Sequence, residues 1–220
     1  MMLVCFAVRE EARFFKPETG KESKTQILLT GIGKHNARRS IGPVLDAKKP
    51  DLVLSCGFAG GLNPELAKGS VVFSLEAGTG LEASLLAAGA RPGRFYCSDR
   101  IATTADEKQR LWKATRADAV EMESKIISEC CRQRKIPSGT IRVILDTANE
   151  DLPLDFNEMM STDQQMNFAK LGLAVLKSPG RIAALLSLQR QSREAAEKLA
   201  DVLNKVLKPV DPAAKTGVSI

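Results

Sequence analysis

The sequence contains few of the residues that build metal, redox or nucleic-acid sites. Histidine occurs once, as His35, and the five cysteines form no CxxC pair. Because zinc in proteins is held mainly by histidine and closely spaced cysteine, we expect neither a metal nor another cofactor. The odd number of cysteines argues against a disulfide framework and fits a reducing compartment. Aromatic residues make up 5% of the chain and do not alternate with basic ones, so the net charge of +6 does not predict nucleic-acid binding.

Long hydrophobic runs are also missing. No apolar run reaches the roughly 18 residues that span a bilayer. The opening MMLVCFAV is a short apolar segment with no positive stretch before it and no small-residue cleavage site after it, which predicts a strand rather than a signal peptide. We therefore expect a cytoplasmic protein. Its 220 residues, 44% hydrophobic and 26% charged, predict one globular domain over residues 1–208 and a flexible tail over residues 209–220.

Short apolar runs alternate with amphipathic segments along the first two thirds of the chain. Runs of strand length lie at residues 3–8, 26–30, 51–56, 70–76 and 140–146, and helical spacing occurs over residues 35–49 and 120–135. Near-continuous apolar strands separated by helices are typical of a parallel sheet that helices cover on both faces. The sequence therefore predicts a single α/β domain with a mostly parallel central sheet flanked by helices.

Glycines and carboxylates follow the predicted strands. In a parallel α/β sheet the ligand binds outside the carboxyl ends of the strands, so these residues are the first candidates for a site. They are the acids Glu10, Glu11, Asp146 and Glu150 and the glycines Gly31, Gly33, Gly57, Gly60 and Gly61. Glu121 and Glu123, at the start of the second helical segment, are further candidates. This combination suits a neutral, hydroxyl-rich ligand better than a free anion, which requires arginine or lysine nearby.

Five segments carry a family resemblance. They are AVREEA, TGIGKHNA, CGFAGGL, AVEMES and RVILDTANE, and they occur in this order within about the first 150 residues. The set resembles the nucleoside phosphorylase and nucleosidase superfamily, above all its methylthioadenosine/S-adenosylhomocysteine nucleosidase branch. This resemblance implies a nucleoside phosphorylase-like three-layer fold. The stretch DTANEDLPLDFN and the long helical C-terminus are similar to a subgroup, the hopanoid-associated phosphorylases, which are thought to remove adenine from an adenosyl-hopane intermediate.

The resemblance implies roles for single residues. In the nucleosidases a glutamate after the first strand holds or activates the attacking water, and Glu11 matches it. An acid after the last strand protonates N7 of the purine, and Asp146 matches it. Met122 and Glu123 match the residues that grip the ribose. The chemistry agrees, because glycosidic cleavage builds positive charge on the sugar and negative charge on the leaving base. The remaining substrate-binding residues would be Gly57, Phe58, Ala59, Gly60, Ile101, Ala102 and Glu121.

Two features bear on the nucleophile. Phosphorylases of this superfamily place an arginine at the turn after the third strand, and SCGFAGGL contains none. Phe58 and Leu145 also stand where the nucleosidases usually carry serine. Gly31, Gly33 and Lys34 form a candidate anion site, because backbone N–H groups at a helix start can bind phosphate. The missing arginine nevertheless favours hydrolysis by water over phosphorolysis.

Alternatives remain open at this point. Taken singly, Glu11 fits a solvated helix start, Asp146 an N-cap and Met122 a core position. Three functions are therefore considered. They are a purine nucleosidase that releases adenine, a phosphorylase acting on the same bond in hopanoid synthesis, and a non-catalytic nucleoside-binding protein. The last is disfavoured, because binding alone does not require an acid at N7.

The C-terminal part predicts one more amphipathic helix. An apolar stripe comprises Ile182, Leu185, Leu186, Ala196, Leu199, Leu203 and Val206, and Arg190, Arg193, Lys198 and Lys205 oppose it. Such a stripe favours a helix that packs on its own sheet. The alternative is a surface that meets anionic lipid headgroups at the membrane. We also expect a homodimer, by resemblance to family members of this short architecture.

Overall fold

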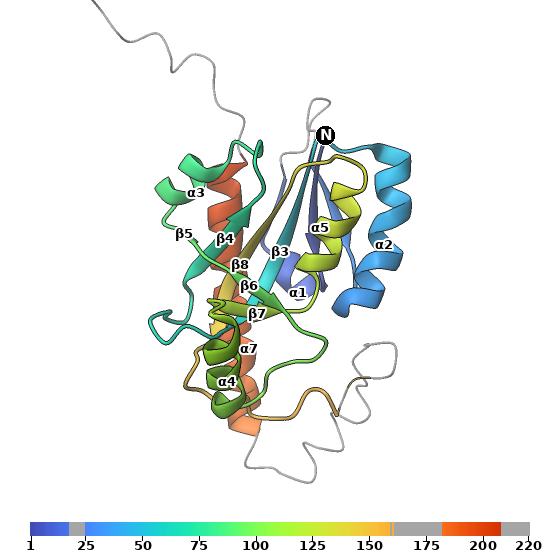
Figure 1. The fold of residues 1–220 in the computed structure, drawn as a ribbon. Coiled ribbons are helices and arrows are strands. Elements are labelled where there is room, and N and C mark those ends of the chain that lie inside the picture. Colours follow the sequence, from blue (N-terminus) through green and yellow to red (C-terminus); the bar gives the residue numbers. More distant parts are fainter. Residues whose placement is uncertain (18–24, 159, 161–181, 208–220) are drawn as a thin grey trace, which may run out of the picture.

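The computed structural model describes residues 1–17, 25–158, 160 and 182–207, which form a single α/β domain around one eight-stranded sheet (Figure 1). The strands are β1 Met2–Phe6, β2 Thr25–Leu29, β3 Leu52–Gly61, β4 Val71–Leu75, β5 Arg91–Pro92, β6 Phe95–Cys97, β7 Ala119–Glu121 and β8 Ser138–Asp146. The helices are α1 Arg9–Ala12, α2 Gly33–Lys48, α3 Glu82–Ala87, α4 Ala105–Thr115, α5 Ser124–Arg132 and α7 Ile182–Val206. The predicted tail, residues 209–220, lies outside the described residues.

The centre of the sheet is parallel, as predicted. Its strand order is β2-β1-β3-β8-β4-β5, and β1, β2, β3 and β8 run in the same direction. Two strand pairs are antiparallel, β4 with β8 and β7 with β3, whereas β5 is parallel to β4 and β6 to β7. The carboxyl ends of the parallel strands meet at one edge of the sheet, the lower edge in Figure 1. This edge is where a ligand site is expected.

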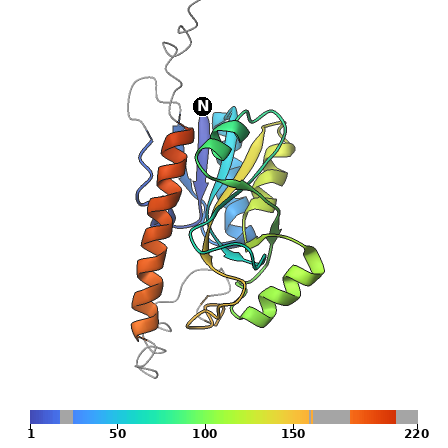
Figure 2. The same ribbon diagram turned by 90° about the vertical axis from the view of Figure 1, so that its left-hand side faces the viewer.

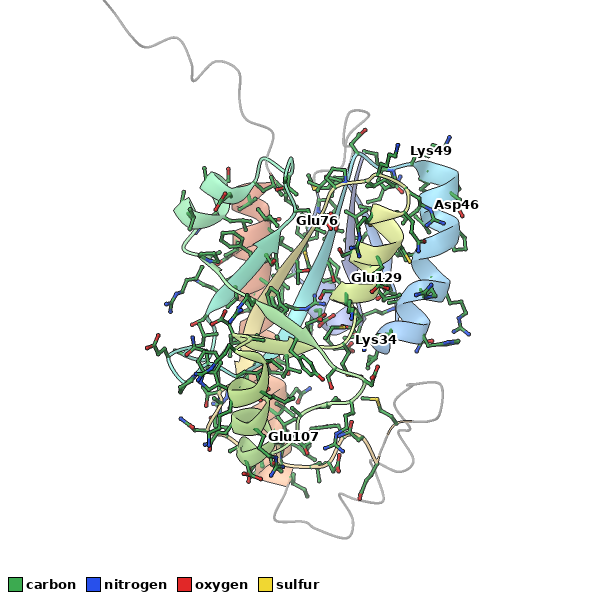
Figure 3. All side chains as sticks on the ribbon, in the orientation of Figure 1. Lys34, Asp46, Lys49, Glu76, Glu107 and Glu129 are labelled. Carbon is green, nitrogen blue, oxygen red and sulfur yellow. The ribbon has the colours of Figure 1, made fainter. Side chains whose placement is uncertain are left out.

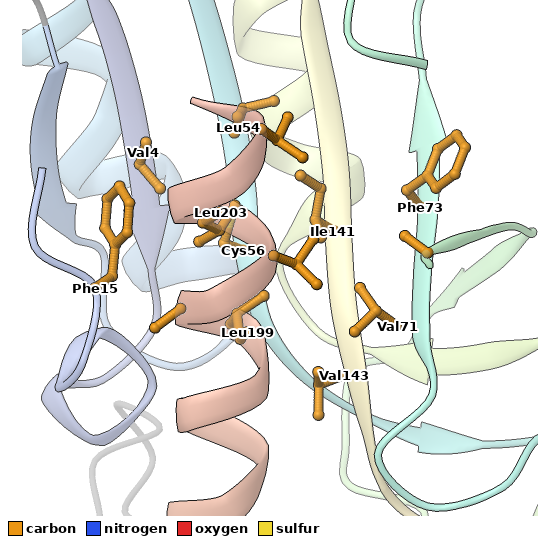
Figure 4. Close-up of a cluster of buried hydrophobic side chains, with 14 of the residues drawn as sticks. Val4, Phe15, Leu54, Cys56, Val71, Phe73, Ile141, Val143, Leu199 and Leu203 are labelled. Atoms are coloured by element: carbon orange, nitrogen blue, oxygen red, sulfur yellow. The ribbon is translucent and has the colours of Figure 1, made fainter. Parts of the chain in front are cut away.

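Helices cover both faces, because successive strand residues point to opposite sides. Helix α7 covers one face (Figure 2). Its Leu199 and Leu203 lie against Val4, Leu54 and Ile141 of the central strands (Figure 4). On the other face, α2 and α5 pack on the neighbouring positions of the same strands. The residues of this second cluster include Leu3, Cys5, Val53, Ala37, Ile41, Leu45 and Ile127.

Helix α7 divides into a buried and an exposed part. Between Ala195 and Val206 its apolar side chains are buried against the sheet, which agrees with a helix that covers its own domain. Ile182 and Leu186, in its first two turns, are exposed. No helix in the described part of the chain is long and apolar enough to cross a membrane. Contact of α7 with lipid headgroups stays a prediction.

Two boundaries differ from the sequence-based prediction. The glycine-rich segment from Gly57 to Gly61 does not follow the third strand but continues it, since β3 pairs with β8 across this segment with a register shift between Ala59 and Gly60. The expected helix over residues 120–135 begins only at Ser124, because residues 119–121 form β7. In both places pairing with a distant strand decides the local structure.

Candidate active site

A cavity of about 420 Å³ opens at the carboxyl edge of the parallel strands, within the ~300–1,000 Å³ of common small-molecule sites. Most of the residues predicted for the site line it. They are Glu11, Phe58, Ala59, Gly60, Ile101, Ala102, Glu121, Met122, Glu123 and Asp146. The structure thus brings together residues from five separate sequence segments. The residues that line the cavity do not include Gly31, Gly33, Lys34 and Gly57.

Glu11 lies in the short helix α1 and lines the cavity. It is 7% exposed, its Oε2 accepts hydrogen bonds from the N–H of Ala7 (2.8 Å) and Val8 (3.3 Å), and its Oε1 accepts one from Phe58 (2.8 Å). Burial raises the pKa of Glu11, although Arg142 and the three backbone N–H groups act against it. A Cβ at Gly57 would lie 2.4 Å from Glu11 Oε1, so this glycine makes room for the carboxylate rather than contacting a ligand.

Arg142 forms the centre of a buried charge cluster beneath the cavity. It lies in β8 in register with Gly57 and is 2% exposed. Its Nη2 lies 2.8 Å from Glu121 Oε2, 3.5 Å from Glu123 Oε2 and 3.1 Å from Ser55 Oγ. The nearby glutamates raise the pKa of Arg142 against the effect of burial. The guanidinium is therefore already neutralised by carboxylates of the same chain.

The carboxylate of Glu121 bonds mainly to other groups of the chain. Its Oε2 accepts hydrogen bonds from the N–H of Glu123 (3.0 Å) and Ser124 (2.7 Å), and its Oε1 accepts one from Ser124 Oγ (2.7 Å). Burial would raise the pKa of this carboxyl, but Arg142 and Ser124 hold it below its ordinary value. Glu121 therefore stays ionised and fixes the turn from β7 into α5, the turn that presents Met122 and Glu123.

Glu123 occupies the helix start that the sequence suggested for phosphate. Its Oε1 accepts a 2.7 Å hydrogen bond from the N–H of Gly33, the first residue of α2. Lys34 is on the same first turn of α2 (Figure 3). Its Nζ pairs with Asp99 Oδ1 at 2.8 Å. Burial and the charges of Glu121 and Glu11 together outweigh Arg142 and raise the pKa of Glu123 to about 7. A carboxylate of the chain thus fills the candidate anion site.

Asp146 also lines the cavity and is the last residue of β8. It is buried, and its Oδ2 forms an ion pair with the ammonium group of Lys108 from α4. Burial raises the pKa of Asp146, while Lys108 acts against this shift. Gly60 lies close by, because a Cβ there would be 3.4 Å from Asp146 Oδ2.

The outer wall of the cavity is mostly apolar. Leu145, Leu152, Phe156 and Leu188 line it, together with the polar Gln189 and Ser192 of α7. The loop after β8 is tied to the segment before α4, because the Asn157 side chain accepts from the N–H of Ile101 (2.9 Å) and donates to its carbonyl (3.0 Å). The backbone of Ile101 is therefore engaged by Asn157.

Sequence reasoning missed three contributors to the site. Arg142 offered a signal, as a charged residue inside the otherwise apolar strand TIRVILD. Lys108 offered none, because its helix is rich in charged residues on every side. The wall from α7 could not be expected either, since nothing in its pattern tells which turn reaches the carboxyl edge of the sheet. Among the described residues, no cluster of histidine, cysteine and acid side chains is arranged to hold a metal ion.

Comparison with known proteins gives consistent matches. A family model described as "Phosphorylase superfamily" matches residues 5–82 and 75–177. The chain is 30% identical over 186 residues to a 5′-methylthioadenosine/S-adenosylhomocysteine nucleosidase of an Exiguobacterium species, with 69% of this chain and 79% of the relative covered.

Solved structures agree on the fold. Futalosine hydrolase of Helicobacter pylori has a TM-score of 0.67 at 16% identity, covering 93% of this chain and 96% of that one. The 5′-methylthioadenosine/S-adenosylhomocysteine nucleosidase of Neisseria meningitidis, solved with methylthio-immucillin-A, has a TM-score of 0.65 at 18% identity, covering 95% and 99%. The family model spans most of the chain, which confirms the resemblance carried by the five sequence segments: this chain belongs to the phosphorylase superfamily.

Proposed function

We propose that this protein is a nucleosidase that hydrolyses the N-glycosidic bond of an adenine nucleoside and releases adenine. As a member of its superfamily it is an enzyme that acts on N-glycosidic bonds. One observation carries the choice of reaction. Glu11, Glu123 and Asp146 line the same cavity, while Arg142 is already paired with Glu121 and Glu123.

The proposed mechanism assigns a separate role to each of the three carboxyl groups. Glu123 and Met122 hold the ribose, and Glu11 orients a water molecule toward its C1′ carbon. The bond from C1′ to N9 breaks, its electron pair stays with adenine, and the protonated Asp146 delivers its proton to N7. The water oxygen then bonds to C1′ and its proton passes to Glu11. The carboxylates around the sugar stabilise the oxocarbenium-like transition state.

The charge balance supports water as the nucleophile. Glu11, Glu121 and Glu123 surround a single guanidinium, so this part of the site carries an excess of negative charge whenever its carboxyls are ionised. The N–H of Gly33 at the N-terminus of α2 donates to Glu123 rather than to an external anion, and Lys34 is paired with Asp99. A phosphate dianion would be repelled here, whereas a neutral water would be polarised.

The relatives suggest the kind of substrate. The Exiguobacterium relative is a nucleosidase for 5′-methylthioadenosine and S-adenosylhomocysteine. We infer an adenine nucleoside with a substituent on its 5′ carbon, which the apolar wall of Leu145, Leu152 and Leu188 would cover. The alternative, phosphorolysis of an adenosyl-hopane, stays a prediction, as do the homodimer and the cytoplasmic location.

Phosphate dependence tests the proposal. The purified protein is incubated with 5′-methylthioadenosine with and without about 50 mM phosphate, an excess that would nearly fill a site of millimolar dissociation constant. We expect adenine to form at the same rate in both buffers, together with the free sugar and no sugar 1-phosphate. Asp146→Asn is the control, and should lower the rate roughly 10²-fold or more.

Other outcomes have definite meanings. Cleavage that occurs only with phosphate would favour the phosphorylase, and Lys34→Ala should then abolish it. Tight nucleoside binding without any turnover, on 5′-methylthioadenosine and on bulkier 5′-substituted adenosines, would favour a binding protein.

A further inference from the structure

Lys108 is a fully buried lysine next to the proposed acid. Its side chain is 0% exposed, although lysine is almost never fully buried without a partner. Its Nζ donates to the carbonyls of Thr147 (3.0 Å) and Glu150 (2.6 Å) and forms the ion pair with Asp146. The two carbonyls and the carboxylate together hold the lysine head in place.

The contacts of Lys108 connect two segments. Asp151 Oδ1 accepts from the N–H of Ala105 (2.7 Å), and the N–H of Leu152 donates to Thr103 (2.8 Å). With the lysine, these bonds tie the amino end of α4 to the loop that follows β8. Hydrogen bonds to the loop after β8 therefore fix the part of α4 from which Lys108 reaches Asp146.

Several charges face Asp146 from the surrounding elements. Asp146 also lines a second cavity of about 320 Å³, to which α7 contributes only uncharged side chains. The charged neighbours are Lys108 from α4, Lys68 from the loop between β3 and β4, Glu150 and Asp151 from the loop after β8, and, around the first cavity, Glu10, Glu11, Arg100, Glu121 and Glu123. Lys68 is paired with Glu150 at 2.9 Å. Lys108 is thus the cation in direct contact with the Asp146 carboxyl.

We propose that Lys108 is a positioning residue that holds the Asp146 carboxyl in place and, through its charge, controls how readily this carboxyl gives up its proton. The proposal rests on the proposed role of Asp146 as the acid. Burial raises the pKa of Asp146, and Lys108 is the main influence that lowers it again. A general acid works best when its pKa lies near the working pH. Lys108 would thereby keep the buried acid from holding its proton too tightly.

Lys108→Met tests the proposal through the pH profile. Since the acid must be protonated, activity falls at pH values above its pKa. Loss of the lysine charge should raise that pKa, so the alkaline limb for 5′-methylthioadenosine should move up by roughly 1–3 pH units, the usual effect of one close opposite charge. Lys113→Met, on the exposed side of the same helix, should leave the limb where it is. Lys108→Arg keeps the charge and should restore the wild-type limb.

A second substrate separates this role from a structural one. The p-nitrophenyl β-riboside has a leaving group that needs no proton. Lys108→Met should slow 5′-methylthioadenosine at least about tenfold, a part of the 10²–10⁴ that acid catalysis supplies, and slow the p-nitrophenyl riboside less than about twofold. Equal losses on both substrates, or an unmoved alkaline limb, would overturn the proposal. If the wild type cleaves neither substrate, the proposed function fails instead.

A double variant covers the case in which Lys108→Met does not fold. Lys108→Met/Asp146→Asn lacks both buried charges, so neither is left without its partner. If Lys108 acts only through Asp146, this variant and Asp146→Asn should cleave both substrates at equal rates. A further tenfold loss in the double variant would contradict the proposal.

Discussion

At position 57 the lack of a side chain decides where a carboxylate can lie. Gly57 is within β3, and a Cβ there would be 2.4 Å from Oε1 and 2.8 Å from Cδ of Glu11. No real Cβ tolerates such distances, so either the Glu11 side chain or the strand must move. The carboxylate is held by three backbone N–H groups, whereas the strand is paired along its length with β8, so the carboxylate is the easier of the two to displace.

Gly57→Ala should therefore cost activity, and it should also cost stability, because the φ of +157° at this position favours glycine. We expect at least a tenfold fall in the rate of adenine release, because a displaced general base loses part of the roughly 10²–10⁴ that acid–base catalysis supplies. Gly42→Ala is the matched control. Gly42 lies in α2, outside the lining of the cavity, and a Cβ there would meet no atom of another segment within 4 Å, so alanine should leave the rate unchanged. No gain in stability is expected, because Gly42 precedes Pro43, whose ring disfavours the helical conformation for a preceding residue with a Cβ. Rates and urea unfolding curves of both variants check this, and full activity in Gly57→Ala would contradict it.

The residues of the site were predictable to different degrees. Glu11, Glu123 and Asp146 stand in short segments of a recognisable family pattern, so the sequence could suggest them. The pairing of Arg142 with Glu121 and of Lys108 with Asp146 joins segments 21 and 38 positions apart, and depends on how β7, β8 and α4 meet in space. A sequence records neither distance nor burial for such pairs.

Among the elements, α7 combines two environments in one helix. Its carboxyl-terminal half supplies the side chains that cover the sheet, and Leu203 among them is 0% exposed. Its amino-terminal half reaches the carboxyl edge, where Leu188 and Ser192 line the cavity while Leu186 is 61% exposed. One helix thus closes the core and forms a wall of the site.

Leu203→Ala should lower the free energy of unfolding by about 2–5 kcal/mol, because it leaves a cavity in a packed cluster. Leu186→Ala removes the same atoms from an exposed position and should change stability by less than about 0.5 kcal/mol. Urea unfolding, followed by circular dichroism, measures both. Equal effects would mean that α7 does not pack on the sheet as described.

The elements also show where sequence reasoning stops. The buried strands β1, β4 and β8 and the helix α2 were predicted, because their apolar patterns are local properties of the chain. The extension of β3 through its glycines was not, since Gly and Ala are weak strand formers and only pairing with β8 keeps them extended. The strand β7 was absorbed into a predicted helix for the same reason: its partners β3 and β6 are distant in sequence.

For the whole molecule, the site concentrates ionisable groups inside the domain. Burial raises the pKa of Glu11, Glu123 and Asp146, while Arg142 and its hydrogen-bond partners lower that of Glu121. Carboxyls with a raised pKa destabilise the folded state when they ionise. The burial of these carboxyls, which suits catalysis, therefore also makes the stability of the folded state depend on pH.

Glu123→Gln should make this dependence visible. The pKa of Glu123 rises from 4.5 to about 7 on folding, so the folded protein binds more protons than the unfolded chain between these values. Its contribution to stability must then fall as the pH rises from about 4.5 to about 7, and glutamine, which does not titrate, removes it. We expect the melting temperature of the variant to increase relative to that of the wild type as the pH rises over this range. The attraction between Arg142 and ionised Glu123 is already contained in the pKa of about 7, so the slope of the melting temperature against pH is the quantity compared. Glu65→Gln, at an exposed position, should run parallel to the wild type, and a Glu123→Gln curve that also runs parallel would show that Glu123 does not titrate as described.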